Sequence, residues 1–548
     1  MLNKKYLQIF GVVMPVIIFA LFIHTRLLGK ITDLDAFYHI KHAWIYATQG
    51  IFNSAFPWTQ FSVIGQVGAD LWYGFHILII PFTLFPDLLD GIRYGAFFIT
   101  ITTFLLVYWA LKRLRIKWPL FWLAVFGFAS AVLLVRLTML RPHSLSLALS
   151  LLLFAYLTTS HSELPAGGEI SREKSLATNV NRQVRMTILG IFLTGLILSW
   201  LHIALAWLPI LVAMMVLLME ILHRQKIYLS KYAALAIGLV AGVLLRPNPF
   251  GAIKLAYIQV VQLLFEKNLP LRFGVELYPY VWENFAEELI PITTLLIIGI
   301  TFVGWLSYTK KLKEISAETK APIFASLILT GFFALLTYAV ARRSNDLFIG
   351  FGVILLGLIF TYWQSTRPVF HKKSTALNVI AIVMVIVLLY MPIKNIFLFD
   401  IYVFISFRRH GLAAERFKDL SLWLKENSRP EEIVFNIHWD NFAQLFFWNH
   451  NNYYINGMDP IFQYVFEPSS YWKVHYYAID EAGPFTCGMT RCTPRENEYT
   501  PLVLKRNFNA SYIMVEKHRN PKVFEYLDNA REFQKVFENG GEALYRIP

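Results

Sequence analysis

The chain has 548 residues, of which 56% are hydrophobic and 16% aromatic, and its mean hydropathy is +0.49. Only 16% of the residues are charged, against about a quarter in soluble proteins, so the composition excludes an ordinary soluble protein and predicts a multi-pass membrane protein with a soluble part attached. The net charge is +14. Residues 1–394 hold 33 basic and 17 acidic residues, a net +16, whereas residues 395–548 hold 17 basic and 19 acidic residues, a net −2. This basicity indicates membrane topology and headgroup contact, and no nucleic-acid partner is expected.

Eleven apolar runs are long enough to cross the roughly 30 Å of hydrocarbon in a bilayer as helices. The first reads as a retained signal anchor, because no small-residue cleavage site follows it. A shorter run, 71–86, carries His76 and Pro81 and is expected to be an interfacial helix. The expected spans are 6–27, 91–111, 118–135, 143–159, 186–201, 203–222, 228–245, 290–308, 321–340, 346–363 and 376–393.

The basic loops predict an orientation. With the N-terminus in the cytoplasm, the segments KRLRIK, HRQK, KKLK and RPVFHKK and the polar loop 160–185 all fall inside, as the positive-inside rule requires. Residues 1–394 then form a transmembrane module in the cell (cytoplasmic or inner) membrane. Residues 395–548 form an extracytoplasmic domain.

The stretch ITDLDAFYHIKHAW directly follows the first run and carries Asp33, Asp35, His39 and His42. On a helix, Asp35 and the two histidines share one face. A carboxylate in this place can act as a general base or help to hold a divalent cation. The alternative is a helix N-terminus that aspartate caps, with solvated neighbours.

Six arginines fall on the predicted outer side, where the topology rule slightly disfavours them. Arginine binds phosphate bidentately, although its side chain also reaches lipid headgroups without a specific site. Five of the six lie at the outer ends of spans, on the same side as the two aspartates, which favours a pocket for an anionic lipid head such as a phosphorylated polyprenol. The six are Arg136, Arg141, Arg246, Arg272, Arg342 and Arg343.

The tail alternates helical and strand patterns and predicts one small α/β domain. The segments EIVFNI, YYING and SYIMVE are expected to be strands, and ERFKDLSLWLKEN is expected to be an amphipathic helix. NPKVFEYLDNA is expected to be a helix that its first Asn caps. Cys487 and Cys492 can form a disulfide in an extracytoplasmic domain; the alternative is two free thiols.

The motif DLDAFYHIKHAW at the start of the first external loop resembles the acidic motif of the GT-C superfamily of membrane glycosyltransferases. Its form is especially similar to that of archaeal and bacterial oligosaccharyltransferase catalytic subunits. A long first external loop (28–90), a multi-span body and an external C-terminal domain agree with that family. The resemblance implies a GT-C fold with about 11 transmembrane helices and an inverting enzyme that uses a polyprenyl-phosphate-linked or polyprenyl-pyrophosphate-linked sugar.

The resemblance also assigns roles. Asp35 matches the family's principal acidic position, with Asp33 as its companion. ARRSNDLF resembles the segment that contacts donor phosphate, so Arg342 and Arg343 carry over. Arg246 and Arg141 are expected to help them.

Other segments match the family less well. In RLTMLRPHSL, where oligosaccharyltransferases place metal-binding carboxylates, this chain has Arg141 and His143. In HWDNF, Trp439 and Asp440 match the W-W-D-Y-G motif, and the other three residues do not. Further candidates are His202, at the outer junction of two spans, and Glu276, Glu287 and Glu288 in the external loop 246–289.

Several functions therefore compete. The first is transfer of one sugar from a polyprenyl-phosphate donor to a glycan, lipid or protein, which often needs no metal. The second is oligosaccharyltransferase-like transfer to protein with a divalent cation, Mg²⁺ or Mn²⁺, that Asp35 helps to bind. The third is a non-catalytic scaffold, and the fourth is a lipid-linked glycan transporter, although transporters usually carry charges at mid-membrane and show repeats.

Overall fold

The computed structural model describes residues 4–159, 174–281, 288–308, 316–366, 375–409 and 414–548. The chain forms two compact units. The helical unit comprises Met1–Thr32, Arg93–Leu245 and Val275–His410, and the loop–tail unit comprises Asp33–Ile92, Arg246–Gly274 and Gly411–Pro548.

The first external loop thus folds with the tail. The boundary that the sequence suggests, at 394/395, lies inside a helix that ends at Arg409. Glu287 and most of the loop 160–185 lie outside the described residues.

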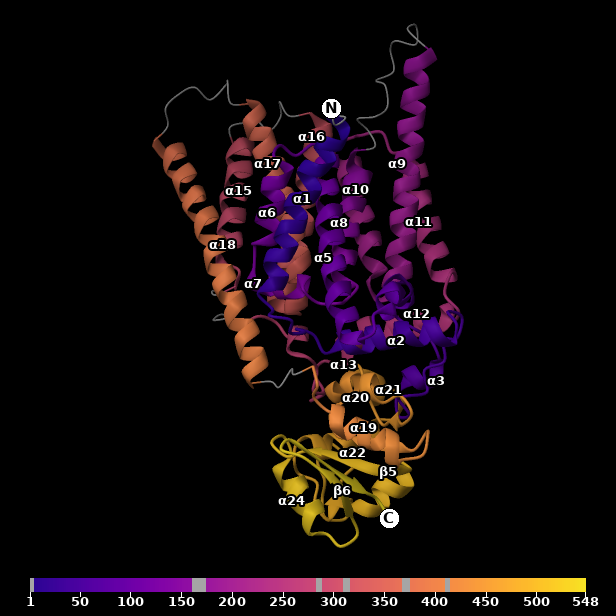
Figure 1. The fold of residues 1–548 in the computed structure, drawn as a ribbon. Coiled ribbons are helices and arrows are strands. Elements are labelled where there is room, and N and C mark those ends of the chain that lie inside the picture. Colours follow the sequence, from indigo (N-terminus) through magenta and orange to yellow (C-terminus); the bar gives the residue numbers. More distant parts are fainter. Residues whose placement is uncertain (1–3, 160–173, 282–287, 309–315, 367–374, 410–413) are drawn as a thin grey trace. The chain divides into compact units, whose positions relative to one another are not determined.

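The helical unit is built from the apolar runs, because a backbone in lipid must satisfy its polar groups internally and a helix does so. Its elements, with α5 beginning in the other unit, are α1 (Lys4–Thr25), α5 (Leu88–Arg113), α6 (Pro119–Gly127), α7 (Ala131–Leu137), α8 (His143–Thr159), α9 (Lys174–Leu201), η2 (Ile203–Leu205), α10 (Trp207–Leu222), α11 (Leu229–Leu244), η4 (Val275–Leu277), α15 (Ile290–Tyr308), α16 (Ala317–Ala339), η6 (Arg342–Ser344), α17 (Asn345–Thr366) and α18 (Thr375–Arg409) (Figure 1).

Each predicted apolar run is largely helical in the structure, although the run 118–135 is divided between α6 and α7. Among the described residues, six helices are long and apolar enough to cross a membrane, or eight if each of two bent pairs is one span. One bent pair is α6 and α7, which meet at 96°. The helices α1, α8 and α15 are shorter apolar helices. The chain is therefore a multi-pass membrane protein, and the count of eleven stays a prediction.

Helices α9 and α11 pack side by side through glycine (Figure 1). A Cβ atom on Gly238 would lie 2.3 Å from the Phe192 carbonyl oxygen, and one on Gly242 would lie 2.2 Å from the Leu196 carbonyl oxygen. Small residues allow this close backbone approach between membrane helices, where dispersion contacts replace the hydrophobic effect.

The loop–tail unit mixes short helices and strands. Its elements are α2 (Asp35–Gln49), α3 (Val63–Val67), α4 (Tyr73–Ile79), η1 (Ile80–Leu84), α12 (Pro249–Tyr257), η3 (Ile258–Gln262), α13 (Leu263–Glu266), α19 (Lys418–Asn427), β1 (Ile433–Asn436), η8 (Trp439–Asn441), α20 (Phe442–Trp448), β2 (Tyr453–Tyr454), α21 (Pro460–Phe466), α22 (Pro468–Ala478), β3 (Phe485–Thr486), β4 (Glu498–Tyr499), α23 (Thr500–Leu502), η9 (Val503–Asn507), β5 (Ala510–Glu516), α24 (Pro521–Asn529), β6 (Gln534–Glu538) and β7 (Glu542–Arg546).

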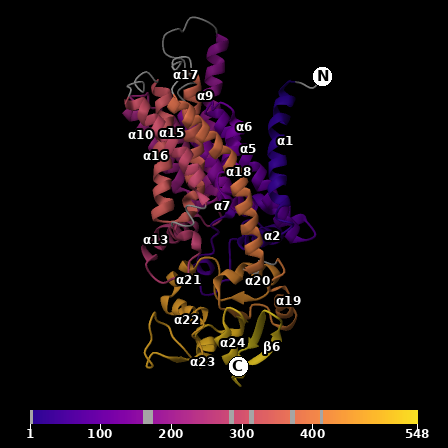
Figure 2. The ribbon, with the colours of Figure 1, turned by 90° about the vertical axis from the view of Figure 1, so that its left-hand side faces the viewer.

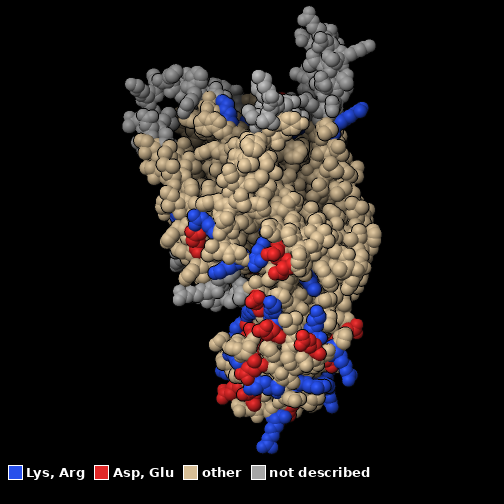
Figure 3. Space-filling model, viewed as in Figure 1, with Lys and Arg blue, Asp and Glu red and all other residues tan. Residues whose placement is uncertain are grey.

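The sheet of this unit has the order β2-β1-β5-β7-β6. Strand β1 runs parallel to β2 and β5, whereas β7 runs antiparallel to β5 and β6. The core of this unit joins Phe435 of β1 and Ile513 of β5 with Tyr477 of α22 and Leu527 of α24. Figure 2 shows α22 and α24 together with the strands of the tail. The predicted α/β fold is confirmed. The charged side chains visible in Figure 3 gather on the tail, whereas the visible surface of the helical unit is largely uncharged.

The first external loop joins the tail as an extra sheet edge. The Tyr454 N–H donates to the Trp58 carbonyl at 2.8 Å, the Gln60 N–H donates to the Tyr454 carbonyl at 2.9 Å, and the Phe61 N–H donates to the Ile455 carbonyl at 2.9 Å. These bonds explain why the loop and the tail form one unit. Sequence patterns do not show pairing over such a separation.

The helix predicted at NPKVFEYLDNA is present as α24, but its predicted cap is wrong. The Asn520 side chain makes no cap bond; its amide donates to the Tyr477 carbonyl at 2.8 Å, and its oxygen lies 2.7 Å from His438 Nε2. The Asp480 carboxylate instead accepts from the N–H groups of Lys522 and Val523 at 3.1 and 3.0 Å. A partner distant in sequence supplies the cap.

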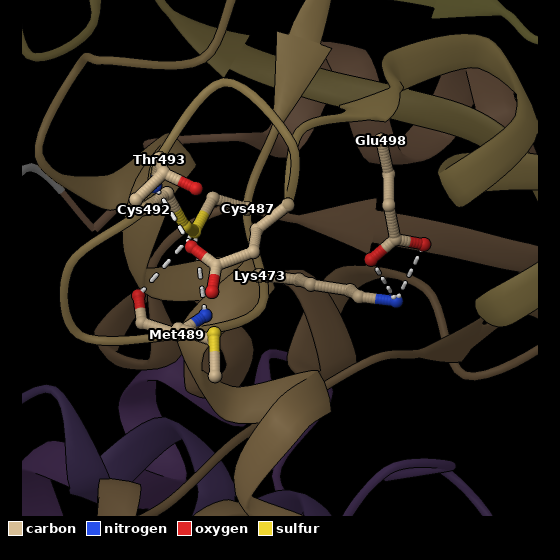
Figure 4. Close-up of a disulfide and its surroundings, with 7 residues drawn as sticks. Lys473, Cys487, Met489, Cys492, Thr493 and Glu498 are labelled. Atoms are coloured by element: carbon tan, nitrogen blue, oxygen red, sulfur yellow. Dashed lines mark hydrogen bonds and ion pairs between the residues drawn. A yellow bond between two sulfur atoms is a disulfide. The ribbon is translucent and has the colours of Figure 1, made fainter.

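Cys487 and Cys492 form a disulfide that closes a short loop (Figure 4). Beside it, Lys473 Nζ lies 2.9 Å from a Glu498 carboxylate oxygen. Both side chains of this ion pair belong to the tail, so the disulfide and the ion pair hold the segment between α22 and β4.

Candidate functional site

Asp35 is the first residue of α2 and Asp33 supports it. The Asp33 carboxylate accepts the Asp35 N–H at 3.1 Å and is buried, whereas Asp35 is half-buried. The N-terminus of a helix is electropositive and favours an ionised carboxylate. The geometry therefore gives the two aspartates different environments, with Asp35 the more accessible.

The two histidines of the motif lie behind Asp35 and are both buried. His39 Nδ1 lies 2.8 Å from His76 Nε2, and His76 Nδ1 lies 2.6 Å from Asp70 Oδ2. His42 Nδ1 lies 2.9 Å from the Tyr38 hydroxyl. His39 and His42 therefore belong to a buried polar network and are not exposed on the surface.

Asp70 is the centre of this network. Its carboxylate accepts from the Tyr46 hydroxyl at 3.1 Å and from the Trp72 N–H at 2.8 Å. Burial acts to raise the pKa of Asp70, but the nearby His76 and His42 rings and the bonds from His76 and Trp72 hold that pKa well below its usual range. Burial lowers the pKa of His42 to about 3. At neutral pH, Asp70 is therefore an anion and His42 is neutral.

Sequence reasoning did not select Asp70 or His76 as site residues. His76 was visible as a histidine in a short apolar run, and an aspartate six residues before it was the available signal. His42, Asp70 and His76 form a group that could hold a metal ion, since one ligand atom from each lies within 4.8 Å of the others. Asp35, the residue predicted to bind metal, is not part of that group.

Arg246 also contacts this network. It is only 4% exposed, and its Nη1 donates to the Asp70 backbone carbonyl at 2.7 Å. It lies in the loop–tail unit, whereas Arg141, Arg342 and Arg343 lie in the helical unit. The structure therefore does not bring these four predicted phosphate ligands into one unit.

The helical unit holds a cluster of arginines around the starts of α8 and α17; this arginine cluster comprises Arg136, Arg141, Arg342 and Arg343. Arg136 Nη1 lies 3.0 Å from an Asp346 carboxylate oxygen and donates to the Arg343 backbone carbonyl at 3.0 Å. Arg343 is exposed, and the Arg342 guanidinium carbon lies 5.3 Å from the centre of the Tyr280 ring. Arg136 thus holds the segment that presents Arg343.

The pKa of the Glu276 carboxyl is lowered by arginines of this cluster. Burial acts to raise its pKa, but the charges of Arg141, Arg343 and Arg136, with a backbone hydrogen bond, hold that pKa below its usual value. Glu288, by contrast, accepts from the Tyr280 and Tyr402 hydroxyls at 2.5 and 2.6 Å. The sequence gave no reason to choose between Glu276 and Glu288. In the structure, Glu276 interacts with the arginine cluster, whereas Glu288 bonds two tyrosine hydroxyls.

His143 and His202 lie beside the first turn of α8. His143 Nε2 is 3.3 Å from the Ser144 hydroxyl, and its Nδ1 is buried without a hydrogen-bond partner among the described residues. His202 Nδ1 is 3.4 Å from the Ser146 hydroxyl. Since His143 and His202 also interact electrostatically, both belong to the surroundings of the arginine cluster.

The side chains of Trp439 and Asp440 make hydrogen bonds within the loop–tail unit. Trp439 Nε1 donates to the Arg272 backbone carbonyl at 3.0 Å. The two Asp440 carboxylate oxygens accept from Arg519 at 3.2 and 3.1 Å. These contacts attach the segment Arg246–Gly274 to the tail and hold the W-D pair in place.

This architecture is the GT-C fold, the fold of the superfamily that the acidic motif resembles. No protein-family model and no curated protein matches the sequence. Solved structures do match its fold.

An archaeal oligosaccharyltransferase, AglB from Archaeoglobus fulgidus in complex with an inhibitory peptide and a dolichol-phosphate, matches with a TM-score of 0.57 and 12% identity, over 100% of this chain and 75% of that one. ArnT from Cupriavidus metallidurans bound to undecaprenyl phosphate matches with a TM-score of 0.52 and 11% identity, over 98% of both chains. At such identity the likeness shows the fold.

Proposed function

We propose that this chain is a membrane glycosyltransferase that takes a sugar from a polyprenyl-phosphate-linked donor on the extracytoplasmic face. The observation that carries the proposal is the arginine cluster at the starts of α8 and α17. Arginine binds phosphate bidentately, and the Arg343 side chain is exposed. The fold supports the proposal, since ArnT and AglB structures of the same fold hold undecaprenyl phosphate and dolichol-phosphate.

In this proposal Arg342, Arg343 and Arg141 offset the negative charge that grows on the leaving phosphate. Asp35 takes the proton of the acceptor nucleophile, or orients that nucleophile. The acceptor oxygen or nitrogen then forms a bond to the anomeric carbon, the bond from that carbon to the phosphate oxygen breaks, and the configuration inverts. The N-terminus is cytoplasmic, and the tail lies outside the cytoplasmic membrane.

Oligosaccharyltransferase-like transfer to protein is the second candidate. The likeness to AglB in complex with an inhibitory peptide favours it. Against it stands the absence of carboxylates at Arg141 and His143, and the contacts that already engage Trp439 and Asp440. Transfer that needs added Mg²⁺ or Mn²⁺ and a peptide acceptor would favour this candidate over single-sugar transfer.

The testing experiment is donor cleavage by the purified chain in liposomes. Polyprenyl-phosphate and polyprenyl-pyrophosphate sugars are supplied with an acceptor mixture. The released polyprenyl phosphate or polyprenyl pyrophosphate is measured for the wild type and for Arg343→Gln. Loss of a charged hydrogen bond costs about 1.5–3 kcal/mol, so we expect kcat/KM to fall about tenfold to a hundredfold. Arg113→Gln is the matched control, because Arg113 bonds Thr159 and Thr187 instead.

Two results would contradict the proposal. The first is no cleavage of any donor by a folded wild type that binds polyprenyl phosphate, which would indicate a scaffold. The second is equal cleavage by Arg343→Gln and Arg113→Gln, which would show that the arginine cluster does not bind the donor.

A further inference from the structure

A second cluster in the loop–tail unit lies apart from the predicted metal residue Asp35. It consists of His42 on α2, Asp70 in the loop before α4, and His76 on α4. All three are buried, with exposures of 2%, 5% and 0%, and one ligand atom from each lies within 4.8 Å of the others. The cluster joins two helices and a loop that are separate in sequence.

Each member of the cluster has an outer partner. His42 uses Nδ1 toward the Tyr38 hydroxyl, and His76 uses Nε2 toward His39. The Asp70 carboxylate accepts from Tyr46 and from a backbone N–H. Metal-binding histidines in proteins show this arrangement, because one ring nitrogen ligates and the other makes a hydrogen bond that fixes the ring. The outer bonds thus point to His42 Nε2, His76 Nδ1 and an Asp70 oxygen as ligands.

We propose that His42, Asp70 and His76 bind a divalent cation of the zinc type, which holds α4 against α2. Two imidazoles and one carboxylate suit zinc, whereas magnesium and calcium prefer oxygen ligands. The cation replaces the hydrogen bond between His76 Nδ1 and Asp70, which are 2.6 Å apart. The His76 proton moves from Nδ1 to Nε2, so that Nε2–H donates to His39 Nδ1. The His39 proton in turn moves from Nδ1 to Nε2 of its own ring, so each ring keeps one proton.

The surroundings support such a site. The His42 ring lies over the Tyr46 ring with centres 4.7 Å apart, and the Phe56 ring is 5.1 Å away. Aromatic walls exclude water, which strengthens the attraction between a cation and the Asp70 carboxylate. Because Asp35 begins the same helix that carries His42, the cation would fix the position of Asp35 without touching it. The proposal does not depend on the proposed function.

The test is metal content. The full-length protein, purified without a polyhistidine tag, is dialysed with Zn²⁺, Mg²⁺ or Mn²⁺ and then freed of unbound ion before elemental analysis. We expect about one zinc per chain and no retained magnesium. Asp70→Asn and His42→Gln should lose the zinc, and His475→Gln, a histidine on α22 of the same unit, should keep it.

A second measurement uses only the wild type, so it tests the proposal even if the variants fail to fold. The melting temperature of the wild type is recorded after chelation and after zinc is restored; we expect a fall and a recovery. The Co²⁺ form should show visible absorption of tetrahedral cobalt. A wild type that retains no zinc and whose melting does not respond to it would overturn the proposal. Zinc retained equally by folded Asp70→Asn and His475→Gln would also overturn it.

Discussion

Three arginines act on one carboxylate in the helical unit, and this gives Glu276 a testable pH signature. Its pKa is lowered in the folded protein, because the charges of Arg141, Arg343 and Arg136 outweigh burial. A lowered folded pKa means that the ionised acid stabilises the protein above the ordinary carboxyl pKa. That contribution is lost as the pH falls through the lowered value.

We therefore expect the wild type to melt at a higher temperature than Glu276→Gln at pH 7. The difference should shrink as the pH falls below about 4.5, the ordinary value. Thermal unfolding of both proteins between pH 3 and 8, in the same detergent, measures this. A difference that grows toward acid pH would contradict the electrostatic assignment of Glu276.

If the arginine cluster binds the donor phosphate as proposed, Glu276 should oppose that binding, because both groups are anions near the same arginines. Glu276→Gln should lower the concentration of polyprenyl phosphate needed for half-saturation, about twofold to tenfold for a partly exposed charge pair. Competition binding with a fluorescent polyprenyl phosphate measures it. Glu481→Gln, whose carboxylate pairs with Lys522 in the tail, is the control. Weaker binding by Glu276→Gln would indicate that Glu276 supports the site instead of competing with its ligand.

At the scale of elements, the close packing of α9 and α11 depends on glycine. Gly242→Ala adds a methyl group 2.2 Å from the Leu196 carbonyl oxygen, so the helices must separate. We expect a loss of about 1–3 kcal/mol, as for other overpacked sites, measured by thermal or denaturant unfolding in detergent. Gly331→Ala in α16 is the control, because its methyl group meets no atom within 4 Å. Equal effects of the two substitutions would contradict the packing argument.

The pairing of Trp58–Phe61 in the first external loop with β2 and the residue after it provides a second test at this scale. Gln60→Pro removes the N–H that donates to Tyr454, whereas Gln60→Ala keeps it. Leaving a buried acceptor unpaired costs about 1–3 kcal/mol. Both variants lose the bond from the Gln60 side chain to the Pro57 carbonyl, and only Gln60→Pro also loses the N–H. We therefore expect limited proteolysis to cleave the loop faster in Gln60→Pro than in Gln60→Ala. Similar cleavage of both variants would show that this edge pairing does not attach the loop to the tail.

Local patterns predicted most elements. The apolar runs predicted the helices. Short runs rich in β-branched and aromatic residues predicted β1, β2 and β5, and the residues of β1 and β5 are nearly all buried. What the patterns missed depends on distant partners. The edge pairing of Trp58–Phe61 with β2, the cap that Asp480 supplies to α24 and the Asp70–His76 network each join residues far apart in sequence. One-dimensional periodicity carries no information about such pairs.

At the scale of the whole molecule, the predicted site residues fall into two sets. Asp33, Asp35 and Arg246 belong to the loop–tail unit, and the arginine cluster with His143 and His202 belongs to the helical unit. The sequence predicted two kinds of group, acidic carboxylates and phosphate-binding arginines, from the side of the membrane on which the predicted topology puts both. It did not separate the buried Arg246 from the exposed Arg343, because side-chain burial depends on tertiary packing.

Donor turnover by Asp35→Asn tests whether Asp35 activates the acceptor nucleophile. The purified chain in liposomes is given a polyprenyl-phosphate sugar and an acceptor mixture, and released polyprenyl phosphate is measured. Asp87→Asn is the control, since Asp87 lies in the same loop and accepts the Leu89 N–H, a bond that asparagine can keep. We predict that Asp35→Asn binds polyprenyl phosphate but loses at least about a hundredfold in kcat, as for loss of a general base, while the control keeps its rate. Full turnover by a folded Asp35→Asn would contradict the account.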